Sequence, residues 1–313
     1  MEHEQKISRQ LFIFNILLVL AVIFMTFLLL QNSEQSKQQK IVEAKVEKKS
    51  LAVFENVNVK AKSVMVYDVA DKRVLYAKNE GVQLPLASIT KLMTALVATE
   101  LLPKNSNITV KSEFLREEGD SGLLANESWN LKELLDFSLV TSSNDGARSV
   151  ASVIGAVKLN SKDYDLGRKD FIEKMNNRAK ELGLAQTFFV NETGLDVGNV
   201  SGGYGSAVDV NNLMKYMIRN QPEVLEATKY TNISIDSNSK KHNAKNTNDI
   251  INSIPGLFAS KTGYTDMAGG NLVIAFDPSL GKPIIVTVLG STQEGRFEDV
   301  QTLVQTTLEY LNQ

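Results

Sequence analysis

The sequence predicts an α+β fold, in which a mixed, mainly antiparallel sheet is formed by the N- and C-terminal segments of a globular part and is flanked by helices, with a helical subdomain inserted between those segments. Strands are predicted near both ends. Residues 63–80 alternate in polarity around a break at Asp71 and Lys72, as in a β-hairpin, and residues 270–290 contain two apolar runs joined by a turn. Residues 113–220, which lie between, show mainly helical periodicity.

The individual helices follow from the spacing of apolar side chains. A helix is expected over residues 86–102, directly after Pro85, because proline is common near helix starts. Residues 132–140 and 170–182 are the clearest periodic runs of the inserted subdomain. A last periodic run, residues 298–312, predicts a helix that closes the chain.

The N-terminal part contains an uncharged apolar run at residues 11–30. A helix of this length spans a hydrocarbon core of ~30 Å, whereas a secretory signal has only ~7–15 apolar residues and a small-residue cleavage site. The sequence therefore predicts a cytoplasmic tail (1–10), an uncleaved transmembrane anchor (11–30), a polar linker (31–60) and a globular domain (61–313). Because lysines are more numerous after the run than before it, the positive-inside rule alone would place the globular domain in the cytosol.

Composition excludes several kinds of function. Lys and Arg number 34 against 36 Asp and Glu, and this balance argues against nucleic-acid binding. The chain has no cysteine, so it has no thiol nucleophile and no cysteine-type zinc site. The only histidines are His3 and His242, so we expect no metal site and a catalytic base other than histidine.

A Ser-x-x-Lys pattern opens the helix expected at residues 86–102. The pattern occurs three times in the chain, but only Ser88 and Lys91 begin an apolar helix. A spacing of three residues puts two side chains on one helix face, with Cβ atoms ~5–6 Å apart. The backbone N–H groups at a helix start are also suited to stabilise a developing oxyanion. The alternative reading is a capping serine followed by a surface lysine.

Two further short motifs follow along the chain. Residues 142–144 read Ser-Ser-Asn after an apolar run, and the alternative reading is a turn at a helix end. The Ser-x-Asn pattern also occurs at residues 128–130, so it is weak alone. Residues 261–263 read Lys-Thr-Gly, and the alternative reading is a turn that leads into the strand expected at 271–276.

In this order, Ser-x-x-Lys, Ser-x-Asn and Lys-Thr-Gly are the motifs of penicillin-binding proteins and β-lactamases. The chain resembles the D-alanyl-D-alanine carboxypeptidases, the low-molecular-mass penicillin-binding proteins, over roughly residues 61–313. The likeness includes residues 171–195, 246–248 and 255–272. The resemblance implies a β-lactamase/transpeptidase-like fold and makes the globular domain the catalytic domain.

Ser88 is a weak nucleophile until a base removes its proton, and Lys91 is the candidate base. Lysine has an ordinary pKa of about 10.4, so Lys91 must be shifted to be neutral near pH 7. Burial and a nearby like charge are the two effects that lower a lysine pKa. Lys261 is the expected like charge.

The resemblance implies the other catalytic roles. Ser142 and Lys261 would pass a proton to the nitrogen of the leaving D-alanine, while Asn144 would hold the substrate amide and help to fix the lysine base. The backbone N–H groups of Ser88 and Tyr264 would form the oxyanion hole.

The resemblance also implies the substrate-binding residues. Lys261 and Thr262, with Gly263 beside them, would offer a positive charge and donors to the terminal carboxylate of the substrate. Arg296, which follows the last strand, is a further candidate for binding this carboxylate. Its alternative reading is a solvated arginine at a helix start.

Together these features predict a serine-type carboxypeptidase that removes the terminal D-alanine from peptidoglycan stem peptides through a Ser88 acyl-enzyme. The resemblance implies no cofactor, and it implies β-lactams as covalent inhibitors. Because peptidoglycan lies outside the cytoplasmic membrane, we expect the catalytic domain to face outward from its membrane anchor.

Three alternatives remain. A class A-like β-lactamase would use a Glu-x-x-x-Asn segment for deacylation, and the segment that begins at Phe171 fits the carboxypeptidase pattern instead. A D,D-endopeptidase would use the same site, and the sequence does not separate it from a carboxypeptidase. A non-catalytic wall-binding protein is expected to lose one of the four residues Ser88, Lys91, Asn144 and Lys261, all of which are present.

Overall fold

The computed structural model describes Met25 and residues 52–119 and 122–313. The predicted tail, the anchor apart from Met25, and most of the linker lie outside the described residues. No helix within the described part is long and apolar enough to cross a membrane. Contacts between Cα atoms divide the chain into two units, residues 1–55 with Gln313 and residues Asn56–Asn312. In the first unit the structure describes the 3₁₀ turn η1 (Ala52–Phe54). The second unit carries the three motifs.

The second unit contains a five-stranded sheet whose order is β10-β11-β12-β1-β2 and whose neighbouring strands are all antiparallel. Its strands are β1 (Ser63–Asp68), β2 (Arg73–Lys78), β10 (Leu257–Thr265), β11 (Gly269–Phe276) and β12 (Ile284–Ser291). The prediction of a sheet built from both ends of the globular part is confirmed, since β1 pairs with β12. The sheet is antiparallel throughout rather than mixed.

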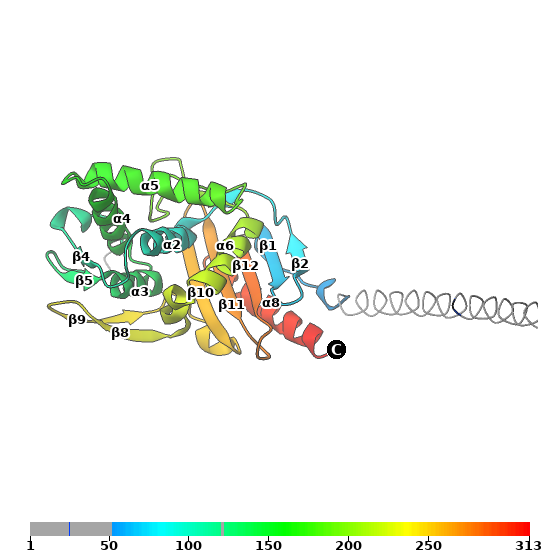
Figure 1. Cartoon of the computed structure of the whole chain (residues 1–313). Coiled ribbons are helices and arrows are strands. Elements are labelled where there is room, and N and C mark those ends of the chain that lie inside the picture. Colours follow the sequence, from blue (N-terminus) through cyan, green and yellow to red (C-terminus); the bar gives the residue numbers. More distant parts are fainter. Residues whose placement is uncertain (1–24, 26–51, 120–121) are drawn as a thin grey trace, which may run out of the picture. The chain divides into compact units, whose positions relative to one another are not determined.

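The two faces of the sheet are covered by different helices (Figure 1). Alternate side chains of a strand point to opposite faces. In β12, Ile285 and Leu289 belong to the main core cluster, and Thr287 between them accepts a hydrogen bond from Asn211 of α6 (Ala207–Asn220) at 2.9 Å. The intervening side chains of β12 are buried outside that cluster, on the face covered by α8 (Gly295–Leu311).

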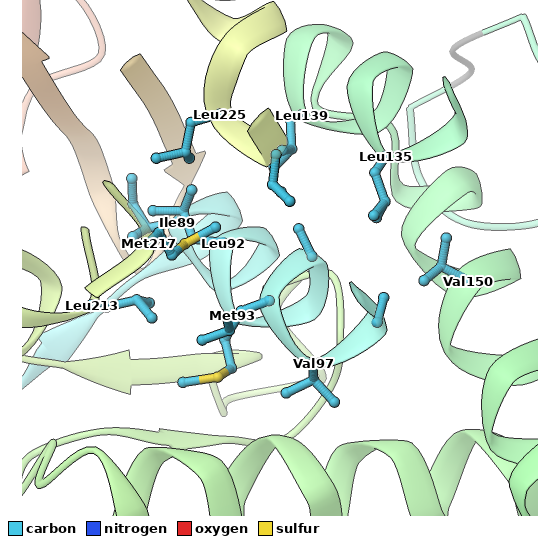
Figure 2. Close-up of a cluster of buried hydrophobic side chains, with 14 of the residues drawn as sticks. Ile89, Leu92, Met93, Val97, Leu135, Leu139, Val150, Leu213, Met217 and Leu225 are labelled. Atoms are coloured by element: carbon cyan, nitrogen blue, oxygen red, sulfur yellow. The ribbon is translucent and has the colours of Figure 1, made fainter. Parts of the chain in front are cut away.

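Helix α2 (Lys91–Leu101) lies at the centre of the helical region. Nearly every one of its side chains is buried, as expected for a helix that is apolar all round. Figure 2 shows its side chains Leu92, Met93 and Val97 among apolar side chains of the surrounding helices. Those neighbours include Leu135, Leu139, Val150, Leu213, Met217 and Leu225. This packing fixes the element that carries Lys91.

The other helices of the region are α3 (Leu131–Thr141), α4 (Asn144–Lys158), α5 (Tyr164–Glu181) and α7 (Pro222–Leu225). The predicted hairpin at 63–80, the two C-terminal strands, the closing helix and the periodic runs at 132–140 and 170–182 all match observed elements. The remaining short elements are β3 (Leu84–Pro85), β4 (Asn107–Thr109), η3 (Ser112–Phe114), β5 (Ser128–Asn130), β6 (Phe188–Phe189), β7 (Gly203–Gly205), η4 (Glu226–Lys229) and η5 (Ile251–Ser253).

Three local expectations need correction. The helix expected from residue 86 starts as a 3₁₀ turn, η2 (Ala87–Thr90), and α2 begins only at Lys91. The Lys-Thr-Gly motif does not lead into a strand but lies within β10. A hairpin of β8 (Asn232–Asp236) and β9 (Lys241–Lys245) has no counterpart in the sequence analysis, because its strands are short and mostly polar.

Candidate active site

Ser88 and Lys91 are brought together by a change of helix type. Ser88 lies on η2, and Lys91 is the first residue of α2. In a 3₁₀ turn the side chains at positions i and i+3 eclipse one another. Nζ of Lys91 accordingly lies 2.9 Å from Oγ of Ser88. The residue before the serine, Ala87, has φ of 48°, an uncommon value for a residue with a Cβ atom.

The Lys91 amine is surrounded by three hydrogen-bond partners. Besides Ser88 Oγ, it contacts Asn144 Oδ1 at 2.6 Å and the carbonyl oxygen of Thr193 at 2.8 Å. The Asn144 amide is oriented by its own Nδ2, which donates to the Glu118 carbonyl at 2.6 Å. The Asn144 and Thr193 oxygens therefore only accept. A neutral amine would donate to both and keep its lone pair for the Ser88 hydroxyl proton.

Burial lowers the pKa of Lys91 to about 7. The negative charges of Glu192 and Glu117 act in the opposite direction and raise this pKa, but burial has the larger effect. Burial is also the largest cause that lowers the pKa of Lys261, followed by the charges of Lys91 and Arg296. Burial and the like charge of Lys261 were the two causes expected to lower the pKa of Lys91. Burial is the cause observed, and it is the largest for both lysines; of the two, it is Lys261 whose pKa is lowered by the other's charge.

Lys261 and Ser142 form a second pair, close enough to Lys91 for its charge to act on Lys261. Ser142 ends α3 in the left-handed conformation, with φ of 61°, and the next residue, Ser143, caps α4 by accepting from the Gly146 N–H at 3.0 Å. Nζ of Lys261 donates to Ser142 Oγ at 2.9 Å and to the Thr262 carbonyl at 2.8 Å. The turn between two helices thus aims the serine at β10.

Strand β10 passes directly beside the turn that carries Ser88. A Cβ atom on Gly263 would lie 2.8 Å from the Leu86 carbonyl oxygen and 3.1 Å from the Ser88 nitrogen, so only glycine allows this approach. The hydroxyl of Thr262 is hydrogen-bonded to that of Thr247 at 2.5 Å. Tyr264, the next residue along the strand, has a half-exposed side chain.

Arg296 is buried at the start of α8, with only 8 % of its surface exposed. Its Nη1 donates to the Gly263 carbonyl at 2.8 Å. The alternative reading as a solvated arginine is therefore wrong. The guanidinium thus holds β10 at the Lys-Thr-Gly motif, and its charge acts on Lys261.

Three groups of the site escaped the sequence analysis as individual residues. The Thr193 carbonyl and the Glu118 carbonyl are backbone groups, which leave no side-chain signature. Thr247 lies in the segment 246–248 and Thr193 in the segment 171–195, and only the family likeness of those segments marked them. Among the described residues, no group of three or more acidic or histidine side chains is arranged to hold a metal ion.

A serine hydroxyl beside a buried lysine of lowered pKa is the arrangement of a nucleophile with its base, and here the pair lies next to strand β10 of the antiparallel sheet. Residues 49–293 match the family model described as D-alanyl-D-alanine carboxypeptidase. The chain belongs to the D-alanyl-D-alanine carboxypeptidase family.

Known relatives agree with this membership. The chain is 32% identical over 255 residues to D-alanyl-D-alanine carboxypeptidase DacF of Bacillus subtilis, covering 78% of this chain but 61% of that protein. It is 32% identical over 220 residues to a D-alanyl-D-alanine endopeptidase of Haemophilus influenzae, covering 68% and 69%. Penicillin-binding protein D2 of Listeria monocytogenes, in its ampicillin-bound form, superposes with a TM-score of 0.66 at 30% identity over 81% of this chain and 99% of that one.

Proposed function

We propose that this protein is a serine-type D-Ala-D-Ala carboxypeptidase that removes the terminal D-alanine from peptidoglycan stem peptides. The observation that carries the proposal is the 2.9 Å contact between Ser88 Oγ and the buried amine of Lys91. Burial brings the pKa of Lys91 to about 7, so a large fraction of this amine is neutral near neutral pH. A neutral amine at this distance is a general base for the serine hydroxyl.

Acylation then proceeds in one cleft. Lys91 takes the hydroxyl proton while Ser88 Oγ bonds to the carbonyl carbon of the penultimate D-alanine. The C–N bond to the terminal D-alanine breaks, and its nitrogen receives a proton through Ser142 and Lys261, whose side chains lie 2.9 Å apart. Asn144 contributes by fixing the amine of Lys91. Water then attacks the ester, releasing the shortened peptide and restoring the serine.

The developing oxyanion needs donors that are in place before the reaction. We assign this role to the backbone N–H groups of Ser88 and Tyr264. The close approach of Gly263 to the Ser88 nitrogen supports the assignment, because it sets β10 directly beside the nucleophile. The terminal carboxylate of the substrate would meet the Thr262 hydroxyl and the charges of Lys261 and Arg296.

The direct test uses the full-length chain and its Ser88→Ala variant. Each is incubated with a D-Ala-D-Ala-terminated peptide and, separately, with a fluorescent penicillin. The expected result is release of D-alanine and a stable fluorescent adduct for the unaltered chain, with neither for the variant. An unaltered chain that forms no adduct at any pH contradicts the proposal. Rapid turnover of the penicillin would instead favour the β-lactamase alternative.

Endopeptidase activity is a second candidate, because relatives from Haemophilus influenzae and other bacteria are named D-alanyl-D-alanine endopeptidases. The same Ser88 chemistry would cleave a D-alanyl bond within a cross-link. A cross-linked stem-peptide dimer offered beside a monomeric pentapeptide distinguishes the two activities. Faster cleavage of the dimer would favour the endopeptidase.

We further propose that residues 11–30 anchor the protein in the cytoplasmic membrane with its catalytic domain outside. The apolar length of this run and the extracytoplasmic position of peptidoglycan support this. Protease added to intact spheroplasts should digest residues 61–313, whereas protection until lysis would contradict the orientation.

A further inference from the structure

A buried carboxylate lies one residue from a hydrogen-bond partner of the catalytic lysine. The Thr193 carbonyl accepts from Lys91 Nζ at 2.8 Å, and the residue before it, Glu192, has no exposed side-chain surface. The Glu192 carbonyl in turn accepts from the Thr94 hydroxyl at 2.7 Å, one turn further along α2. The segment that holds Glu192 is therefore fixed to the helix of the base.

Arg168 of α5 neutralises this carboxylate. Its Nε lies 2.9 Å from one carboxylate oxygen of Glu192 and 2.8 Å from the other. Within the described part of the chain, no other side chain donates to this carboxylate. A carboxylate without solvent exposure is costly unless it is paired. Glu192 therefore depends on Arg168 for its compensation.

The charged groups that face Lys91 come from several elements. Glu192 and Glu117 act on it as anions, and Lys261 is the second amine of the cleft. Glu117 has a partner in Arg148, whose Nη1 lies 2.8 Å from its carboxylate, and its side chain is 22% exposed. The Glu192 carboxylate has no exposed surface, so water screens its charge less than it screens the charge of Glu117.

We propose that Arg168 is a positioning residue of the acylation reaction: by pairing with Glu192, it limits how far this buried carboxylate stabilises a proton on Lys91. The inference rests on the proposed function, in which Lys91 is the general base. Without Arg168, the uncompensated charge of Glu192 would act more strongly on Lys91, whose ammonium form it favours. A base held in its ammonium form cannot accept the Ser88 proton.

The experiment measures the rate of acylation by a fluorescent penicillin from pH 5 to pH 9.5, using the full-length chain. The acylation rate should rise with pH, and the pH at half its plateau is the midpoint. For Arg168→Gln, this midpoint should move up by about one pH unit, so that the rate below the midpoint falls about tenfold and the rate at alkaline pH recovers. For Glu192→Gln, the rise should move in the opposite direction. In the double variant both charges are absent, and the midpoint should return toward that of the unaltered chain.

Arg178→Gln is the matched control, since Arg178 lies on the same helix and pairs with Glu100. Its midpoint should not move, and Arg168→Lys should largely restore the original profile. A fall in rate at all pH values with an unmoved midpoint would assign Arg168 a merely structural role and overturn the inference. Should Arg168→Gln fail to fold, an unmoved midpoint in Glu192→Gln overturns it equally. If the unaltered chain is never acylated, it is the proposed function that fails.

Discussion

Asn144 Oδ1 lies 2.6 Å from Nζ of Lys91, and the other end of the same amide is held by the Glu118 carbonyl, also at 2.6 Å. The asparagine therefore presents a neutral acceptor, rather than a charged one, to the amine that we propose as the base. Neutrality matters here because a carboxylate at this distance would favour the ammonium form of the lysine.

The Asn144→Asp variant tests this relationship with almost no change of shape. The added negative charge should raise the pKa of Lys91 by about 1–3 units, so acylation by penicillin at pH 7 should fall about 10- to 1,000-fold and recover partly at higher pH. Asn220→Asp, at an exposed position of α6, is the control and should acylate normally. Normal acylation by Asn144→Asp would mean that Lys91 is not the base.

The pH dependence of the unaltered chain follows from the same amine. Burial lowers the pKa of Lys91 to about 7, so the neutral fraction grows as the pH rises through this value. The rate of acylation should therefore increase with pH and reach half its plateau near pH 7. A stopped-flow pH series with fluorescent penicillin measures the midpoint. A midpoint near 10, the ordinary range of lysine, would contradict the lowered pKa.

Gly263→Ala tests the contact between β10 and the nucleophile turn. The new Cβ would lie 2.8 Å from the Leu86 carbonyl oxygen, so the strand or the turn must shift by a few tenths of an ångström. A displacement of this size in the site should lower acylation about 10- to 100-fold. Gly81→Ala, where nothing lies within 4 Å, is the control. Equal rates for the two variants would show that the close approach does not matter.

Leu92→Ala tests the packing that holds the catalytic helix. Leu92 is completely buried in the cluster shown in Figure 2, and its truncation should cost about 2–5 kcal/mol of unfolding free energy. Urea denaturation measures this loss. Leu280→Ala, at a fully exposed turn position, should change the free energy of unfolding by less than about 0.5 kcal/mol.

The strands of the sheet differ in how well the sequence predicts them. In β11 and β12 buried apolar residues run almost without interruption, so the pattern indicates strands directly. In β10 the segment Ser260-Lys261-Thr262-Gly263 is buried as well, but it is polar, and its sequence did not indicate a strand; a turn was the alternative reading of its last three residues. Its burial is tolerated because Lys261 and Thr262 find partners on other elements, and a local pattern contains no information about those partners.

The groups of the candidate active site also differ in how well the sequence predicts them. The side chains with a motif, such as Ser88, Lys91 and Lys261, were identifiable from their order in the chain, and the structure brings them into one cleft. The Thr193 carbonyl was not, since any residue has one. Burial was one of the two causes expected to lower the lysine pKa, but the sequence did not show that it would outweigh a like charge, because burial depends on how the helices pack around Lys91.

The order of the sheet also determines when its strands can join during synthesis. β10 reaches the N-terminal hairpin only through β11 and β12, and β1 has β12 as its neighbour on that side. A nascent polypeptide that has emerged from the ribosome only to residue 265 already contains every motif, yet its first hairpin still lacks the strand that joins it to β11 and β10. Translation must therefore run past β12 before the hairpin and the Lys-Thr-Gly strand belong to one sheet.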